Sequence, residues 1–490
     1  MAGLSTALSS ALSGLMVTSS QSAVASKNVT RASDDGYTRK ILGLTTDLFG
    51  NVRAGNVTRT AEKKLIDSVN ASSSDQAGKT AIYDALERLA ETIGDVEADG
   101  SVAWGITQLQ ATLAEYAANP SSLPMASQTI AAASTLAQSL NMAAETVATV
   151  RQEADTAIAA SVSNINTILG KIQELNTQIT SGKQSEVSVP DLMDERDALI
   201  KQLSSEMGVR TLAKPNNGIA IYTDSGATLF DVSARAVTFA ANGAIAPGVT
   251  GNAVYVDGVQ VTGAGSPMPL QRGSIVANVT IRDQLAMTYE AQLDEVARGL
   301  VQLFAETDQS DPPTLDAATG LFSYNGSPTV PPTGTRYPGM AAQLRVNVLF
   351  DASKGGNPML LRDGGANGAA YVYNSEGETG FQARLDSLTS LLSQNQSFDP
   401  SSGLSGSAPI LSFSTQSAGW LEQRRSAAAR DLDSSQATLQ RASEALSRKS
   451  GVNIDEEMAT LLSLEKSYQA SAKVMTTVDN MLSILMDIVR

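Results

Sequence analysis

The densest group of side chains that could do chemistry is a run of carboxylates in the segment "DLMDERDAL", which begins at residue 191. Asp191, Asp194, Glu195 and Asp197 lie within seven residues, and oxygen-rich clusters of this kind can bind Ca²⁺ or Mg²⁺. The run lacks the glycine of a calcium-binding loop, however, and Arg196 interrupts the negative charge. These features favour a solvated helix face with local ion pairs over a metal site.

Two residue types that enzymes often use for catalysis, Cys and His, are missing from this chain. Its 490 residues include no Cys and no His, which excludes Cys–His nucleophiles, Ser–His–Asp triads and zinc fingers. "GAGSPM" (263–268) lacks the third glycine of a dinucleotide-binding loop, and "SKGGNPM" (353–359) lacks the Lys-Ser or Lys-Thr of a phosphate-binding loop. No pair of carboxylate, Lys or Tyr side chains suggests acid–base chemistry. We therefore expect no enzymatic activity, no catalytic residue, no metal and no cofactor.

The charge is negative in total but unevenly distributed. The net charge of −15 argues against a nucleic-acid partner, although residues 1–64 carry eight bases and four acids. No run of 18 apolar residues occurs, so we expect no insertion into a membrane. Residues 1–33 are rich in Ser and Ala, as transit peptides are, but Lys27 and Arg31 are their only bases. A secretory signal would need a charged start and an uninterrupted apolar run.

Both ends of the chain carry apolar stripes at helical spacing. Leu4, Leu8 and Leu15 begin the first stripe, and turn-forming residues 33–36 end that helix. The last helix begins after Asn453, a predicted N-cap, and runs without Gly or Pro for about 54 Å. A stripe that continues to the last residues needs a partner, either the N-terminal helix or other copies of the chain.

The interior alternates between long helices and β-rich segments. Residues 37–60 are predicted as an extended or irregular arm, and helical character resumes at Ile82. A helix of roughly 80 Å is expected from about Met125 to Thr180. "VYVDGVQV" (254–261) predicts a hairpin that turns at Asp-Gly, and a further helix is expected over 274–306.

These patterns predict an α+β multidomain fold. It combines paired N- and C-terminal helices in a coiled-coil-like core, a long-helix bundle and inserted β-rich outer segments. The expected domains are a terminal helical core (1–70 and 450–490), a helical bundle (71–208 and 376–449, with helix 274–306) and one or two β-rich outer domains (209–273 and 307–375).

Several motifs together resemble a known family. "KNV" (27–29) followed by "GYTR" (36–39) resembles the signature of bacterial flagellar axial proteins, in which a helix end runs into Asn-Thr-Pro-Gly-Tyr-Ser-Arg. The segment 450–489 resembles the closing helix of that family through "SGVN", "DEE" and "YQASAKV". "VSNINTILGKIQELNTQI" (162–179) and "DLMDERDALIKQLS" (191–204) resemble the helical body of the hook-associated protein 1 branch, the first hook–filament junction protein.

The resemblance implies a structural function. It implies an extracellular protein of the flagellum, exported unfolded and uncleaved through the type III apparatus. It also implies self-assembly as a ring that connects the hook to the filament through the second junction protein. The implied partners are copies of the chain, the hook protein, the second junction protein, the export apparatus and an export chaperone on the C-terminal helix.

The expected assembly interface combines the two terminal stripes with the signature residues. It consists of Leu4, Leu8, Leu15, Asn28, Gly36, Tyr37, Arg39, Leu461, Leu464, Tyr468, Met475, Val478, Leu482, Leu485 and Val489. The chain departs from the family where Asp34-Asp35 replaces Thr-Pro, so the helix end must be held without the turn that Pro sets.

Two alternatives remain at this point. The chain could be another axial protein, such as the hook protein or the second junction protein, although its length and long inner helices argue against both. It could also be an enzyme with a cleaved N-terminal targeting segment, which is the less favoured interpretation.

Overall fold

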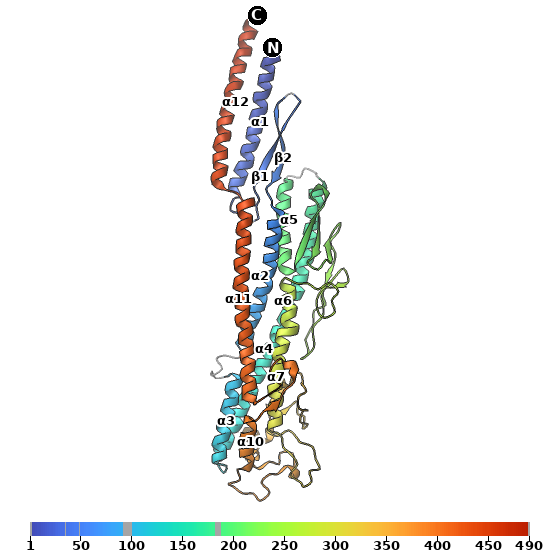
Figure 1. Cartoon of the computed structure of the whole chain (residues 1–490), viewed down its shortest axis with the longest axis vertical. Coiled ribbons are helices and arrows are strands. Elements are labelled where there is room, and N and C mark those ends of the chain that lie inside the picture. Colours follow the sequence, from blue (N-terminus) through green and yellow to red (C-terminus); the bar gives the residue numbers. More distant parts are fainter. Residues whose placement is uncertain (1, 35, 49, 92–99, 182–187, 489–490) are drawn as a thin grey trace.

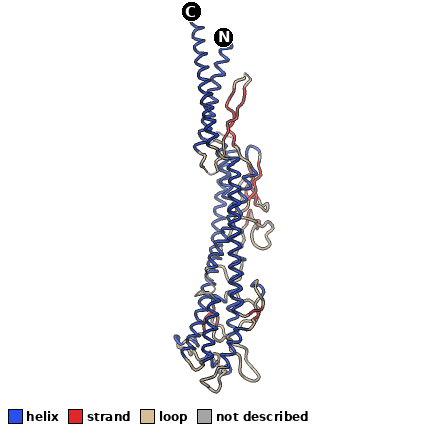
Figure 2. Tube along the Cα trace, turned by 60° about the vertical axis from the view of Figure 1, so that its left-hand side comes forward, coloured by secondary structure: helices blue, strands red, loops and turns tan. Residues whose placement is uncertain are grey.

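The protein is a long rod with both chain ends at the same tip (Figure 1). The computed structural model describes residues 2–34, 36–48, 50–91, 100–181 and 188–488. Helices run along nearly the whole rod, and the strands lie beside them (Figure 2). The helices are α1 (Ala2–Thr30), α2 (Lys63–Ala90), α3 (Val102–Ala118), α4 (Leu123–Ser181), α5 (Val189–Glu206), α6 (Ser274–Thr280), α7 (Ala286–Leu303), α8 (Met340–Gln343), α9 (Leu360–Asp363), α10 (Ala383–Ser393), α11 (Ile410–Ser450) and α12 (Ile454–Ile488).

The strands form small antiparallel sheets, ordered β1-β2, β3-β4-β5, β6-β7-β8, β10-β9 and β11-β12. They are β1 (Lys40–Thr46), β2 (Val52–Arg59), β3 (Val209–Ala213), β4 (Ile219–Thr223), β5 (Thr228–Phe230), β6 (Val237–Thr238), β7 (Tyr255–Val256), β8 (Val259–Gln260), β9 (Phe322–Tyr324), β10 (Leu344–Val346), β11 (Gln396–Ser397) and β12 (Ser407–Ala408). The predicted hairpin at Asp257-Gly258 joins β7 to β8, and both residues have the positive φ of a tight primed turn, +49° and +80°.

The predicted pairing of the terminal helices is confirmed, because α1 packs along α12. Small residues let the two helices approach each other: a Cβ at Gly14 would lie 3.4 Å from the Ser471 hydroxyl. Asn453 caps α12, as predicted, by accepting a hydrogen bond from the Asp455 amide at 3.0 Å. The fold is therefore mostly helical with small inserted sheets.

The body of the rod is organised around α4, whose 59 residues span about 88 Å. Its predicted stripe is buried, and Ile158, Ile165 and Leu169 have almost no exposed surface. Two large apolar clusters lie along it. The cluster nearer the chain ends contains residues 158–172 and packs β3–β8 against α4, whereas the other contains residues 86–154 and 281–428.

The structure refines one expectation and corrects another. Of the two forms expected for residues 37–60, extended or irregular, the structure has the extended one, a paired β-hairpin over 40–59, and α2 begins at Lys63 rather than near Ile82. The first half of α2 buries Asn70, Ser74 and Gly78 against its neighbours. Because small and polar residues make this face, it has no apolar periodicity to detect.

The described residues contain neither a candidate membrane span nor a candidate metal cluster. No helix among them is both long enough and apolar enough to cross a bilayer. No group of acidic side chains in the same part of the chain is arranged to hold a metal ion.

The close contact between α2 and α6 gives a test of the packing. A Cβ at Gly78 would lie 3.1 Å from the Gly273 carbonyl oxygen, whereas a Cβ at Gly170 of α4 would meet nothing within 4 Å. We expect Gly78→Leu to lower the free energy of unfolding by about 1–3 kcal/mol through overpacking. Gly170→Leu should raise it by up to about 1 kcal/mol through helix propensity. Urea unfolding followed by circular dichroism measures both, and equal effects of the two substitutions would contradict this packing.

Candidate functional site: the joint between the terminal helices and the body

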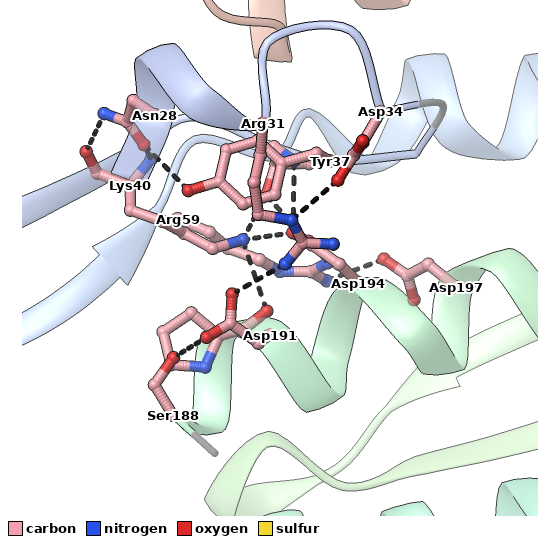
Figure 3. Close-up of polar contacts among 12 residues, drawn as sticks. Asn28, Arg31, Asp34, Tyr37, Lys40, Arg59, Ser188, Asp191, Asp194 and Asp197 are labelled. Atoms are coloured by element: carbon pink, nitrogen blue, oxygen red, sulfur yellow. Dashed lines mark hydrogen bonds and ion pairs between the residues drawn. The ribbon is translucent and has the colours of Figure 1, made fainter. Parts of the chain in front are cut away.

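The candidate site lies where the α1–α12 pair meets the body of the rod. We call it the joint, and it is visible in close-up in Figure 3. Three acceptor groups organise it: the Asn28 side chain at the end of α1, Glu457 in the first turn of α12, and the carboxylates of α5. The joint consists of Lys27, Asn28, Arg31, Tyr37, Thr38, Arg39, Lys40, Arg59, Asp191, Asp194, Asp197 and Glu457.

Asn28 holds the chain as it turns back from α1. Its side-chain oxygen accepts hydrogen bonds from the Tyr37 hydroxyl at 2.9 Å and the Lys40 amide at 3.0 Å. Its amide group donates to the Lys40 carbonyl at 2.9 Å and to Glu457 Oε2 at 3.1 Å. The side chain is 1% exposed, so its hydrogen-bonding capacity is fully used inside the protein.

Glu457 connects α12 to the same turn. Its Oε1 accepts a hydrogen bond from Arg39 Nε at 2.6 Å, while the Arg39 amide donates to the Ser450 carbonyl at 2.8 Å. Arg39 therefore contacts the chain on both sides of the break between α11 and α12. The carboxylate is buried, and its bonds to Arg39 and Asn28 balance the cost of its desolvation.

Asp194 connects the terminal segment to the body. It accepts hydrogen bonds from the Thr38 amide at 3.1 Å, the Thr38 hydroxyl at 2.7 Å and Arg59 Nη1 at 2.9 Å. It also forms an ion pair with Lys40, whose side chain is 3% exposed. Burial lowers the pKa of Lys40, although the hydrogen bond to Asp194 opposes that shift.

Two neighbouring carboxylates of α5 extend this contact. Asp191 pairs with Lys27 at 2.6 Å, and Asp197 pairs with Arg59 Nη2 at 2.7 Å. Burial alone would raise the pKa of Asp191, but hydrogen bonds from Lys27 and Ser188 outweigh it, so this pKa lies below its usual value. Burial raises the pKa of Asp197 despite the attraction of Arg59.

Tyr37 fills the space between these charges. Its ring lies under the Arg31 guanidinium, with 4.7 Å to the centroid, and the Lys40 ammonium, with 4.6 Å. Burial and the nearby charge of Asp191 raise the pKa of Tyr37 to about 12. The phenol therefore stays protonated and keeps donating its hydrogen bond to Asn28.

The acidic run on α5 is not the solvated face that its sequence favoured. Asp191 and Asp194 are largely buried and form ion pairs with basic side chains from residues 27–59. Only Glu195 of the four acidic residues is exposed. The sequence contained a sign of this contact, because residues 1–64 have an excess of basic residues and residues 191–197 have an excess of acidic ones. The five cationic side chains of the joint, Lys27, Arg31, Arg39, Lys40 and Arg59, are all engaged in ion pairs.

The turn after α1 is held without proline. Gly36 adopts a φ of +85°, which a residue with a side chain rarely takes. Asp34 accepts a hydrogen bond from Arg31 Nε at 2.7 Å, and the Tyr37 amide donates to the Asp34 carbonyl at 3.1 Å. Asp35 lies outside the described residues.

The expected interface residues separate into two groups. Asn28, Tyr37 and Arg39 belong to the joint, and Gly36 lies in the turn directly before Tyr37. The terminal stripe lies in the α1–α12 pair, with Val478 buried and Tyr468 exposed. The half-buried members are Leu4, Leu8, Leu15, Leu461, Leu464, Met475 and Leu482. The Leu485 side chain and the whole of Val489 lie outside the described residues.

Four residues that were not among the expected interface residues complete the joint: Thr38, Lys40, Arg59 and Glu457. Each makes a contact with a residue distant in sequence. Glu456, three residues after the Asn453 cap, is exposed, whereas its neighbour Glu457 is buried.

The chain is similar to known flagellar proteins over most of its length. The family model of the flagellar hook-associated protein FlgK helical domain matches residues 86–320, and that of the flagellar basal body rod FlgEFG protein C-terminal matches 442–488. Flagellar hook-associated protein 1 of Bacillus subtilis (strain 168) is 22% identical, and the match covers 93% of this chain and 92% of that protein. The corresponding protein of Escherichia coli (strain K12) is 24% identical over 62% of this chain and 56% of its own length.

A solved structure shares the fold. The flagellar hook junction protein FlgK from Burkholderia pseudomallei superposes with a TM-score of 0.56 at 14% sequence identity, covering 77% of this chain and 99% of that one. The family models, the relative that spans nearly the whole chain and the shared fold agree with one another. The chain therefore belongs to the flagellar hook-associated protein 1 (FlgK) family, the non-enzymatic hook–filament junction proteins of the bacterial flagellum.

Proposed function

We propose that this chain assembles with copies of itself into a ring that connects the hook to the second junction protein. The α1–α12 pairs form the inner core of the ring, and segments 209–273 and 307–375 point outward. The chain reaches this position through the type III export apparatus without cleavage, helped by a chaperone on its C-terminal helix. The hook protein and the second junction protein are its axial neighbours.

The observation that carries this proposal is the apolar surface of α12 that α1 leaves uncovered. Packing against α1 covers only one face of α12. Several large apolar side chains of α12 therefore remain between 46% and 69% exposed. Exposed apolar groups gathered on one element are typical of an interface between molecules. They are Met458, Leu462, Tyr468, Val474, Met481, Ile484 and Met486.

We also propose that the ring resists load, and the contacts of the joint support this part of the proposal. Ion pairs are poor sources of net stability, but buried pairs specify one geometry because a displaced partner leaves an unpaired charge. Lys40 and Arg59 on the hairpin side both pair with Asp194 on the body. The joint therefore fixes the direction of the α1–α12 pair relative to the rod.

The proposed assembly is tested by two substitutions on α12. Ile484 is 61% exposed and Val478 is 7% exposed in the single chain. We expect Ile484→Asp to leave the thermal unfolding of the monomer unchanged, while cells that carry it lose motility and shed their filaments. Val478→Asp should lower the stability of the monomer as well, because it places a charge in the α1–α12 contact.

Labelling the chain on sheared flagella locates it. Label at the hook–filament boundary agrees with the proposal. Label along the hook or along the filament would contradict it, as would normal filaments in cells that carry only Ile484→Asp.

The second prediction concerns the link between the terminal segment and the body. Asp194→Asn leaves the Lys40 ammonium buried and unpaired, and breaking a buried pair costs about 3–5 kcal/mol. Trypsin cleavage after Arg39 and Lys40 should therefore become at least about tenfold faster. Glu195→Gln is the matched control on the same helix, because Glu195 is exposed, and it should change nothing. Equal cleavage rates in the two variants would show that Asp194 does not hold this segment.

The third prediction uses the lowered pKa of Asp191. A carboxyl group whose folded-state pKa is depressed contributes stability above its unfolded pKa of about 4, and loses it as the pH falls through the folded-state value. The difference in unfolding free energy between the natural chain and Asp191→Asn should thus be largest at neutral pH and shrink below about pH 4. Urea unfolding across this range measures it. A difference that grows on acidification would contradict the assignment of the Lys27–Asp191 pair as stabilising.

A further inference from the structure

The body of the rod has a break in its apolar core. One cluster extends along α4 as far as Ala154 and resumes at Ile281, whereas the other begins at Ile158 and ends at Val279. The same level of the rod carries charges with almost no exposed surface, of which Arg151, Asp155 and Arg282 are 2%, 0% and 1% exposed. We call this group, with Asp283 and Glu290, the charge belt.

The charge belt links α4 to the helix that packs against it. Arg282 Nη1 contacts Asp155 Oδ1 at 2.6 Å, and Arg151 Nη1 contacts Glu290 Oε2 at 2.7 Å. Arg151 Nε also donates to the Arg282 carbonyl at 3.1 Å. Every one of these contacts is polar, so apolar packing does not pass from one cluster to the other through the charge belt.

A π turn places part of the charge belt. Between α6 and α7 the helix widens over Ile281–Leu285, and Arg282 and Asp283 lie in this turn. Arg282 contacts Asp283 as well as Asp155, so the turn brings two carboxylates onto one guanidinium. Single π turns within α-helices cost stability and are found mostly where they serve a function.

An irregular loop crosses the rod at the same level and is held by the charge belt. We call residues 240–252 the strap. The Asn242 amide donates to Asp155 Oδ2 at 2.7 Å, the Gly248 amide to Glu290 Oε1 at 2.9 Å and the Gly251 amide to Asp283 Oδ1 at 2.9 Å.

Backbone carbonyl groups of the strap also accept hydrogen bonds from the two arginines of the charge belt. The Ala246 carbonyl accepts from Arg151 Nη1 at 3.3 Å, and the Asn252 carbonyl accepts from Arg282 Nη2 at 2.9 Å. Asn252 also closes the base of the strap, because its side chain donates to the Ala240 carbonyl at 2.9 Å.

The strap has little apolar anchoring of its own. None of its residues is buried, and Val249 is 54% exposed. Its backbone approaches so closely that a Cβ at Gly251 would overlap the Arg282 guanidinium. Apart from a close contact of Pro247 and Gly248 with residues 338–339, the strap is therefore attached to the rod mainly by hydrogen bonds to charged groups.

We propose that the charge belt divides the body into two units, one around each apolar cluster, that unfold locally and separately. We propose also that the strap links these two units. Buried ion pairs add little net stability compared with apolar packing, but they fix one register. A rod with an uninterrupted core would open as one cooperative unit. Here α4 continues through both units, while apolar contact stops at the charge belt.

Native-state hydrogen exchange on the full chain tests this proposal. Asp155→Asn removes the charge that holds both Arg282 and the strap, and Asp257→Asn is the control, since Asp257 lies in an exposed turn that Asn-Gly also forms. We expect Asp155→Asn to speed exchange of the Asn242, Gly248 and Gly251 amides at least tenfold. Amide hydrogen exchange should also accelerate by a similar factor in only one of two segments of α4, residues 130–150 or residues 158–172. In the other segment the exchange rate should change less than twofold.

A second variant covers the case in which Asp155→Asn does not fold. Gly251→Ala leaves every charge of the charge belt in place but forces the strap away from Arg282. It should produce the same unequal exchange in the two segments of α4. Equal acceleration of both segments, or unchanged exchange of the strap amides in a folded variant, would overturn the proposal.

Discussion

The constraint on which the architecture depends is a buried carboxylate, Asp194, that takes its hydrogen-bond donors from residues 38–59, between α1 and α2. Without it, the hairpin side of the joint would hold a buried lysine and a nearly buried arginine with too few acceptors. With it, the α1–α12 pair has one direction relative to the body. The long helices determine the length of the molecule, and this contact determines how its two parts are aligned.

The helices of this protein pack through small side chains, with few large aromatic ones. Aromatic residues make up 4% of the chain, so each contact buries little area, and helices instead approach closely through Gly, Ala and Ser. Stability then comes from contact length, as in α4 and in the α2–α11 pair. A molecule of this design gains more from neighbouring copies than a compact globule does, because most of its helices lie near a surface.

Local patterns predicted much of the fold, whereas the joint depended on distant contacts. The stripe of α4, the break before Asn453 and the Asp257-Gly258 turn are each determined by residues within a few positions, so the sequence was sufficient to place them. Asp194, by contrast, meets Thr38 and Arg59 across 156 and 135 positions. An acidic run on a helix is compatible with solvent, metal or distant bases, and only the fold decides which of them it meets.

The chain passes between the terminal part and the body twice, through residues 60–62 and again through 451–453. Arg39 links the two connections, because its amide donates to the Ser450 carbonyl at 2.8 Å and its carbonyl accepts from the Thr60 amide at 2.8 Å. One connection would allow the terminal pair to swivel about a single backbone. Two connections, joined by Glu457 through its bonds to Asn28 and Arg39, behave as a double tether that resists rotation about the long axis. A twist of the body about the long axis would therefore have to deform both connections together, whereas a single connection would let the two parts turn about one backbone.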